Sequence, residues 1–446
     1  MKRWIVALSG IMVVMGPGAI YSYSLFTQPL IASFGWSATT TTWAFALANF
    51  FLALGAVIGG FWVDRKGPRG AALAGAALWG AGNILTGTTV MGNGVEALYL
   101  CYGIIGGLGC GMAYIAAVST VLRWFPAARG FGGGLVLAGF GLGAFVYNML
   151  IRSWASYPAI AAQSQAYAVQ RAQALSDRVP FVHANYALSS DLVSGLMNVF
   201  VTSGVVFLVV GAIFALLLEA PPANDPAYAP VGHQAGTVEM LMTPQFYLLW
   251  TMLFINVTAG IIIISNAVPI MSELTSESVG VVTGWYIFLS LFNGLGRIFW
   301  GALSDHIGRR LTFAVIFGVQ VVVFFALGAL HDLVTVSVSF ALVLFCYGGG
   351  FGSMPAFSSD YFGTKNFGLN YGVTLTAWGL AGLFGPSFVS TIKDLTGSYG
   401  AALQPIGIML LVAIVFPLIS EQVTVRAPQT AAQPPNPPVP AAVGHQ

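Results

Sequence analysis

One arginine, Arg297, lies far from both ends of a long apolar segment, where a charge is costly. It precedes Asp305 by eight residues, which is roughly 12 Å along a helix axis. If Asp305 marks the membrane surface, Arg297 lies near the middle of a hydrocarbon core about 30 Å thick. A full charge there costs at least about 2.5–3.5 kcal/mol on insertion scales, so a functional role is expected. A guanidinium binds a carboxylate through two parallel hydrogen bonds, which makes anion binding the chemistry to consider.

Three polar side chains extend from Arg297 at helical spacing. Asn293 lies one turn before it, Ser290 one turn further, and Tyr286 at the outer end, so the four residues share one helix face. A buried ion pair is the alternative explanation for the arginine. The acidic residues, however, lie in connections or at segment ends. Examples are Glu96, Asp191, Glu273, Glu277 and Asp332. Because no carboxylate falls within a turn or two of the expected midplane, an anionic ligand is the better partner.

The elements that carry these residues are expected to be transmembrane helices. Of the 446 residues, 57% are hydrophobic and 7% are charged, against about 25% charged in an ordinary soluble domain. Apolar windows of spanning length predict twelve helices in an all-α membrane protein. They lie near 4–26, 41–63, 71–91, 96–122, 131–152, 191–218, 244–270, 279–303, 312–330, 334–358, 371–393 and 401–420.

Several functional classes are disfavoured by the composition. A formal net charge of +2 gives no reason to expect a nucleic-acid partner. The three cysteines lie in apolar segments, and no Cys/His cluster has the spacing of a metal site. The five histidines are scattered through loops and the tail. We therefore expect no metal, no cofactor and no enzyme active site.

Charge distribution predicts the orientation and the division of the chain. Lys and Arg concentrate on one side of the membrane, which the positive-inside rule makes cytoplasmic. Both termini are expected there, in a monomer in the cytoplasmic (inner) membrane. Two six-helix halves, 1–218 and 244–420, are joined by a cytoplasmic linker, 219–243. Residues 153–190 form an outward-facing insert, expected to be a surface helix or, alternatively, a substrate lid or partner site, and the Pro-rich tail 421–446 is expected to be disordered.

An internal repeat supports the two halves. The connections after the second and eighth helices both have the pattern G-x-x-x-D-[R/H]-x-G followed by a basic residue. Its members are Gly60, Asp64, Arg65, Gly67 and Arg69 in the first copy and Gly301, Asp305, Gly308 and Arg309 in the second. With Arg123 and Arg129 after the fourth helix, they are expected to close the cytoplasmic side, where each aspartate can bind arginines and helix ends.

Superposing the two copies gives a comparison for Arg297. Counting back eight residues from Asp64 reaches Ala56, while Gly60 matches Gly301. The scaffold positions therefore agree between the halves, but the charge does not. A charge that breaks the repeat at mid-membrane depth is better explained by a ligand than by the fold.

Aromatic residues are candidates for the remaining walls of the site. They are Tyr21, Tyr114, Tyr347, Phe351 and Trp378. A phenol can donate a hydrogen bond to a carboxylate while its ring shapes a small apolar pocket. Each of these residues alone could equally serve packing. Tyr114 and Tyr347 gain weight because they lie at matching places, beside Gly111 and Gly348.

The duplicated loop resembles the signature of the major facilitator superfamily over about residues 1–420. A narrower resemblance is to the oxalate:formate antiporter and bacterial monocarboxylate transporter family. It is carried by Tyr21-Ser22-Tyr23-Ser24-Leu25-Phe26, Arg123-Trp124-Phe125-Pro126, Thr243-Pro244-Gln245-Phe246, Asn293-x-x-x-Arg297 and Asn370-Tyr371-Gly372. The resemblance implies that Arg297 binds the substrate carboxylate. It implies that Asn293, Tyr114 and Tyr347 surround it.

One departure from the family pattern bears on the substrate. The resemblance implies that oxalate transporters carry a lysine where this chain has Trp378. A single cation favours a monoanion, since a second buried carboxylate would have no partner. We therefore expect a transporter of lactate, pyruvate, formate or a similar monocarboxylate, coupled to protons or to anion exchange. An oxalate:formate antiporter and a membrane substrate sensor are the alternatives.

Overall fold

The computed structural model describes residues 1–230, 232–396 and 398–420, and within them every regular element is a helix. The tail 421–446, expected to be disordered, lies outside the described residues. The first half contains α1 Lys2–Gly18, η1 Ala19–Ser22, α2 Ser24–Phe34, α3 Ala38–Lys66, α4 Pro68–Leu98, η2 Tyr99–Gly106, α5 Gly107–Trp124, α6 Arg129–Arg152, α7 Tyr157–Ser176, η3 His183–Asn185 and α8 Ser190–Leu216.

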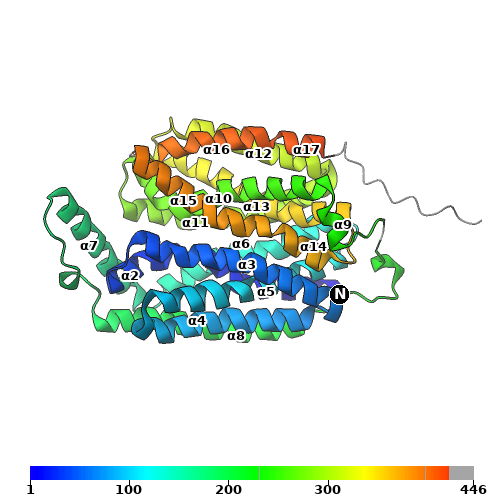
Figure 1. Ribbon diagram of the computed structural model, residues 1–446, viewed down its shortest axis with the longest axis horizontal. Coiled ribbons are helices and arrows are strands. Elements are labelled where there is room, and N and C mark those ends of the chain that lie inside the picture. The colour runs from blue at the N-terminus through cyan, green and yellow to red at the C-terminus, as the bar shows by residue number, and fades with distance from the viewer. Residues whose placement is uncertain (231, 397, 421–446) are drawn as a thin grey trace, which may run out of the picture.

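The linker contains two short helices, η4 Pro226–Tyr228 and α9 Thr237–Leu241. The second half contains α10 Pro244–Thr275, α11 Val279–Ile307, α12 Arg309–Leu327, α13 Leu333–Phe362, α14 Phe367–Thr374, α15 Thr376–Thr396, α16 Gly400–Ala413 and α17 Val415–Ile419. In Figure 1 the two halves form two stacked layers, with the N-terminus and the linker at one end and α7 at the other. We call these the linker end and the insert end.

Eleven continuous helical segments of the described chain are long and apolar enough to cross a membrane. One of them, Pro68–Trp124, has 57 residues, which would be about 85 Å if straight, more than twice the bilayer core. It turns at Gly94, whose φ is 69° and ψ is −153°. Its two arms then pack side by side, since Gly75 lies against Gly109 and Gly82 against Gly106. This segment therefore holds two of the twelve predicted crossings.

The turn at Gly94 gives a stability prediction. Its backbone conformation is one that only glycine adopts without strain, which costs other residues about 1–3 kcal/mol. We expect Gly94→Ala to lower the unfolding temperature in detergent by several degrees. Gly92→Ala is the matched control, because nothing lies within 4 Å of its added methyl group and its φ is not positive. Equal unfolding temperatures for the two variants would contradict this account of the turn.

The first spanning segment is broken where it meets the centre of the molecule. Pro17 lies inside α1, and the chain passes into the 3₁₀ turn η1, which carries Tyr21. Gly18 allows this turn to approach the backbone of Phe140 on α6, because a side chain there would overlap the Phe140 carbonyl. The break therefore places the Tyr21 ring between the two halves.

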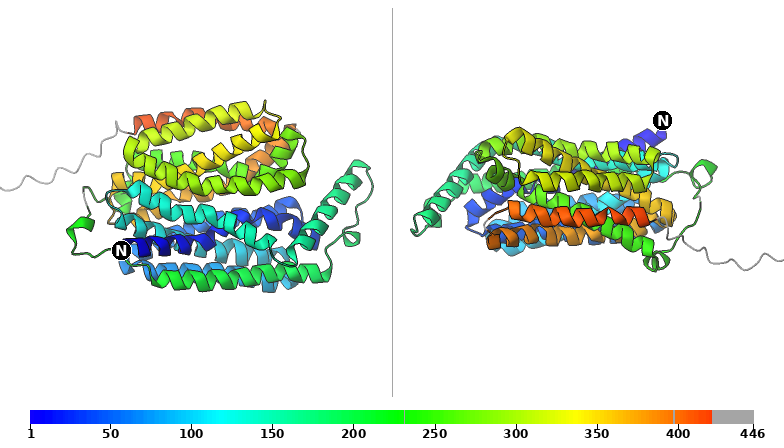
Figure 2. Two further views of the ribbon diagram at one scale, coloured as in Figure 1. Left: turned by 180° about the vertical axis from the view of Figure 1, so that it is seen from behind. Right: turned by 90° about the horizontal axis from the view of Figure 1, so that it is seen from above.

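The insert packs on the first half. The Tyr157 hydroxyl donates a 3.0 Å hydrogen bond to the Leu25 carbonyl, and the Leu188 amide donates to the Ala32 carbonyl at 3.2 Å. Both acceptors are on α2. Figure 2 shows α7 projecting beyond the ends of the spanning helices in both views. The insert therefore supports the outer part of the first spanning segment.

Candidate functional site

Arg297 is fully buried on α11, with an exposed fraction of 0%. Its Nε donates to Asn293 Oδ1 at 3.2 Å. Its Nη1 and Nη2 make no well-formed hydrogen bond with any described residue, although the Tyr21 hydroxyl lies beside the guanidinium. Two rings face the guanidinium, with Cζ 4.9 Å from the centroid of Phe351 and 5.3 Å from that of Phe140. The charge therefore has aromatic neighbours from both halves and no carboxylate partner among the described residues.

An aromatic cage surrounds this guanidinium. The Trp378 ring contacts three other rings of this cage, with centroid distances of 4.7 Å to Phe351, 5.4 Å to Phe140 and 5.5 Å to Tyr114. Tyr347 contacts Phe351 at 5.2 Å, and Tyr21 contacts Phe140 at 5.4 Å. All five aromatic residues predicted from the sequence are therefore brought together around Arg297.

Two members of the cage were not predicted. Phe140 comes from α6, and Tyr371 from α14 brings its hydroxyl next to that of Tyr114 without a well-formed hydrogen bond. Tyr371 lies in the Asn370-Tyr371-Gly372 motif, which was a signal for it. For Phe140 the sequence held a weaker indication, namely the glycines around it on the same helix, which favour close approach of another helix. Gly134 and Gly141 let α6 approach the Arg297 backbone and Nε, respectively.

Buried donors without well-formed hydrogen bonds converge in this cage. Besides the two guanidinium nitrogens, they are the hydroxyls of Tyr114 and Tyr371 and the indole N–H of Trp378. A buried donor left unsatisfied costs about 1–3 kcal/mol. Such a cluster is stabilised when an acceptor enters, and a carboxylate offers two oxygens with several lone pairs. The arrangement can therefore bind a small anion.

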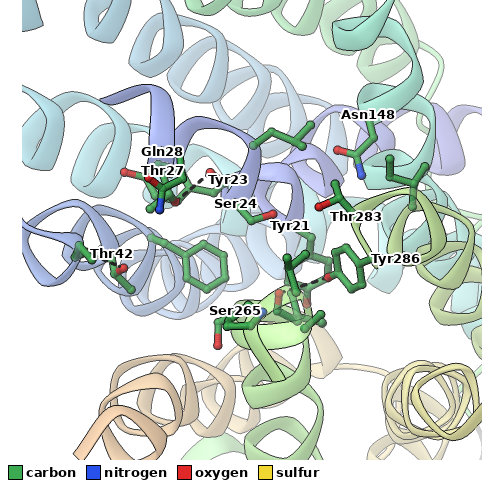
Figure 3. Close-up of a pocket in the computed structure, with 18 of the residues that line it drawn as sticks. Tyr21, Tyr23, Ser24, Thr27, Gln28, Thr42, Asn148, Ser265, Thr283 and Tyr286 are labelled. Atoms are coloured by element: carbon green, nitrogen blue, oxygen red, sulfur yellow. Dashed lines mark hydrogen bonds between the residues drawn. The ribbon is translucent and has the colours of Figure 1, made fainter. Parts of the chain in front are cut away.

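A hydrogen bond between the two halves lies on the outer side of the cage. The hydroxyls of Tyr21 and Tyr347 are 2.6 Å apart. Tyr21 also lines a cavity of about 490 Å³ between the halves. Figure 3 shows this cavity, which we call the vestibule, with Tyr21, Asn148, Thr283 and Tyr286 among its polar lining residues. Tyr21 therefore lies both in the wall of the vestibule and in the cage around Arg297.

The polar stripe predicted on α11 leads from the vestibule toward Arg297. Tyr286 lines the vestibule, and a narrow cavity beside it is lined by Tyr286, Ser290 and Asn293. Tyr21 lines both spaces. The residues that the sequence placed one turn apart thus mark a path from the insert end toward the centre of the molecule.

The linker end is closed by two equivalent contacts between the halves. Asp64 accepts hydrogen bonds from the amides of Gly368 (3.1 Å) and Leu369 (2.8 Å) at the start of α14, and from Arg123 at 2.6 Å. Asp305 accepts from the amides of Gly130 (2.9 Å) and Phe131 (2.8 Å) at the start of α6. Each helix N-terminus stabilises the carboxylate that it binds.

Close backbone packing completes this closure. A side chain at Gly60 would overlap the Gly368 carbonyl, and one at Gly301 would overlap the Gly130 carbonyl. Gly67 and Gly308 have φ values of 84° and 85° and begin the helices that follow. The two copies of the loop pattern therefore adopt the same conformation.

The basic residues near this closure differ in their partners. Arg309 donates to Asp305 at 2.7 Å and to Asp360 at 3.0 Å, and Arg129 reaches Asp360 at 3.4 Å. Arg65 instead stacks on Phe61 of its own helix. Arg69 binds the start of the linker and the residue before it. It donates to the Leu218 carbonyl at 3.0 Å and to Glu219 at 3.5 Å. Among the described residues, Arg65 and Arg69 therefore make no hydrogen bond or ion pair with the second half.

Glu219 also binds the N-terminal segment. A hydrogen bond from Lys2, at 2.9 Å, lowers the pKa of the Glu219 carboxyl. The pair is exposed, so its contribution to stability is small.

The glycine contacts also establish the register of the repeat. Gly134 lies against the Arg297 carbonyl and Gly372 against the Ala56 carbonyl, so Ala56 is the counterpart of Arg297. Gly111 lies against the Leu52 carbonyl and Gly348 against the Asn293 carbonyl. The counterpart of Tyr114, three residues after Gly111, is therefore Phe351.

This register corrects the expectation that Tyr114 and Tyr347 match. Three residues separate Gly111 from Tyr114 and Gly348 from Phe351, whereas Tyr347 precedes Gly348. Tyr347 corresponds to Cys110 instead. Both tyrosines nevertheless lie in the cage, because their helices cross the centre of the molecule.

Comparison with known proteins identifies the family. The model of the Major Facilitator Superfamily matches residues 6–162, 190–386 and 249–444. The chain belongs to the major facilitator superfamily. The predicted membership, all-α fold and transporter class are therefore confirmed, and the protein is a multi-pass membrane transporter.

Two relatives within the major facilitator superfamily have names that mention carboxylates. The chain is 31% identical over 390 residues to the oxalate:formate antiporter of Oxalobacter formigenes, covering 86% of this chain and 83% of the relative. It is 22% identical to monocarboxylate transporter 14 of Mus musculus, covering 93% and 89%. A solved structure of the superfamily transporter FucP in the outward conformation has a TM-score of 0.68, 14% identity and coverage of 94% and 99%, which shows the shared fold.

Proposed function

We propose that this transporter carries a small monocarboxylate, such as lactate, pyruvate or formate, and that Arg297 binds its carboxylate. The observation that supports this most is the fully buried guanidinium whose two terminal nitrogens make no well-formed hydrogen bond in the described chain. Charge-assisted bonds to Nη1 and Nη2 satisfy both groups at once. Asn293 already holds Nε at 3.2 Å, which fixes the plane of the guanidinium.

The cage supports a monoanion over a dianion. Its other described members are aromatic, and the family position that holds a lysine in oxalate transporters holds Trp378 here. A second carboxylate would be buried against rings without a counter-charge, at a cost of several kcal/mol. The indole N–H and the Tyr114 hydroxyl, both without well-formed hydrogen bonds, suit the hydroxyl or keto oxygen of a short 2-substituted acid instead.

The two closures support transport by alternating access. The vestibule opens at the insert end, while Asp64 and Asp305 hold the linker end shut. We assign the linker end and both termini to the cytoplasm, in the inner membrane of the cell. Substrate enters past the Tyr21–Tyr347 bridge, and the halves then rock about the occupied site.

The charge on Arg297 favours exchange of one anion for another as the coupling mode. An empty carrier that closes on both sides buries an unpaired guanidinium, whereas a bound carboxylate neutralises it. The occupied protein therefore passes through the closed state more easily than the empty one. Proton symport is the alternative. Exchange predicts that internal lactate accelerates uptake of labelled lactate, with no change when the proton gradient is collapsed.

Counterflow in proteoliposomes tests the proposal. Vesicles loaded with lactate, pyruvate, formate or oxalate are supplied with a trace of labelled lactate outside. We expect uptake above that of protein-free vesicles with the three monocarboxylates and little with oxalate. Faster counterflow with oxalate than with lactate would contradict the monoanion assignment. Binding of lactate without any flux would favour a sensor over a transporter.

Trp378 gives a prediction about charge selectivity. Trp378→Lys adds a second cation beside Arg297, so we expect oxalate uptake to rise at least about tenfold relative to lactate uptake. Trp378→Phe is the matched control, since it removes the indole without adding charge, and it should leave the oxalate-to-lactate ratio low. The ratio of initial counterflow rates measures the effect. An unchanged ratio in Trp378→Lys would show that this position does not determine substrate charge.

A further inference from the structure

Residues outside the cage fix the position of Tyr347 through hydrogen bonds. Asn256 on α10 donates from Nδ2 to the Tyr347 carbonyl at 3.2 Å. Gln320 on α12 donates from Nε2 to Asn256 Oδ1 at 3.5 Å. Both amide side chains are fully buried. A chain of hydrogen bonds thus runs from α12 through α10 to the residue whose hydroxyl meets Tyr21.

The Tyr347 ring packs closely against α10. Gly260 is one turn after Asn256, and a methyl group there would overlap Cγ and Cδ2 of the Tyr347 ring. On the opposite helix, a methyl group at Gly350 would overlap the Asn256 amide. Glycine at each place therefore lets α10 and α13 approach closely enough to fix both the backbone and the ring of Tyr347.

Packing alone does not explain these amides. Polar side chains buried inside spanning helices are costly, and they are retained where they serve a specific purpose. The Gln320 Oε1 atom has no hydrogen-bond partner in the described chain, so the pair is not an optimised structural contact. A leucine at either place would pack in the same apolar surroundings without that cost.

We propose that Asn256, supported by Gln320, and Gly260 are positioning residues that hold the Tyr347 hydroxyl for the bridge to Tyr21 and for the incoming anion. This inference rests on the proposed function, because it assigns the purpose of the bridge to admission of a carboxylate. Displacing Tyr347 along α13 lengthens its 2.6 Å contact with Tyr21. The path from the vestibule to Arg297 then opens without a substrate, and the hydroxyl is misplaced for binding one.

A set of variants in proteoliposomes tests the role of these residues. We expect Asn256→Leu to raise KM for lactate about three- to tenfold with little change in maximal rate, the effect of losing one buried hydrogen bond. Gln320→Leu should act in the same direction but more weakly, and Gly260→Ala more strongly. In the double variant with Tyr347→Phe, the Asn256→Leu effect should largely disappear.

The matched control is Asn83→Leu. Asn83 is also a buried asparagine on a spanning helix, but among the described residues its Nδ2 donates only to the Trp79 carbonyl of its own helix. Its KM should match that of the parent protein. Equal KM values for Asn256→Leu and the parent, or full additivity with Tyr347→Phe, would overturn the inference. If every Asn256 variant misfolds, Gly260→Ala carries the same test.

A second measurement does not depend on the substrate. In a cysteine-free background, Ser290→Cys places a thiol in the narrow cavity that Tyr21 lines. We expect Asn256→Leu to accelerate its reaction with a membrane-impermeant methanethiosulfonate severalfold, and Asn83→Leu to leave it unchanged. No lactate counterflow in the parent would overturn the proposed function, while the thiol reaction still decides the inference. An unchanged thiol rate would overturn the inference even where lactate is transported.

Discussion

Arg297→Gln is expected to reduce lactate counterflow at least about 100-fold. The variant removes both Nη donors and the only charge of the cage, and losing one partner of a buried charge pair costs about 3–5 kcal/mol. Arg297→Lys keeps the charge but loses the planar fork that binds two carboxylate oxygens, so an intermediate loss is expected. Initial rates of labelled lactate uptake, normalised to reconstituted protein, measure the series.

The control for this series is Arg178→Gln. Arg178 is an exposed arginine in the insert, far from the cage, and its replacement should leave uptake unchanged. Monodisperse elution of each variant in detergent shows that it is folded. Undiminished uptake by Arg297→Gln would remove the carboxylate from this site, whatever else the protein transports.

Asp64→Asn is expected to open the linker end and depopulate the conformation described here. Asp64 accepts three hydrogen bonds, two of them from the start of α14 in the other half. An amide offers only one acceptor atom, and its NH₂ group faces donors. Losing this partly buried contact costs about 2–3 kcal/mol, which shifts the equilibrium between conformations about 30- to 150-fold. Asp305→Asn should act alike, because it breaks the equivalent contact with α6.

Asp360→Asn provides the contrast. Asp360 also joins the halves, through Arg129, and pairs with Arg309 of its own half. Its side chain is 38% exposed, so its ion pairs contribute about 1 kcal/mol or less. Reaction of Ser265→Cys, in the vestibule, with an impermeant reagent reports the open fraction. We expect at least a tenfold slower reaction in Asp64→Asn and nearly the parent rate in Asp360→Asn. Equal rates in the two would show that the carboxylates do not hold the linker end shut.

The positions of the spanning segments along the chain could be predicted because the thickness of the bilayer sets the length of each crossing. The apolar windows located the spanning segments, including the two joined at Gly94, since a crossing needs about 20 apolar residues wherever it packs. The depth of Arg297, counted back from Asp305, stays a prediction. The spacing of Ser290 and Asn293 fixed their shared face, because helix geometry alone sets it.

Predictions about rotation and partners needed the tertiary structure. Phe140 was missed because an apolar residue in an apolar segment does not itself show what it faces, and the glycines around it indicate only that another helix comes close. Tyr347 was matched with Tyr114 because both lie beside a glycine, whereas backbone contacts of Gly111 and Gly348 show that Phe351 is the counterpart. Asn256 and Gln320 are distant in sequence from Tyr347, and only helix packing brings them behind it.

The sequence by itself determined the membrane class, the duplicated halves and one cation far from both ends of an apolar helix. These follow from composition, spacing and the cost of a charge in hydrocarbon, which are properties of the chain. The tertiary structure decided which rings surround that cation, that its two terminal nitrogens lack well-formed hydrogen bonds in the described chain, and that the linker end is shut while the vestibule is open. Those depend on how helices rotate and approach, which is set by contacts between segments far apart in the sequence.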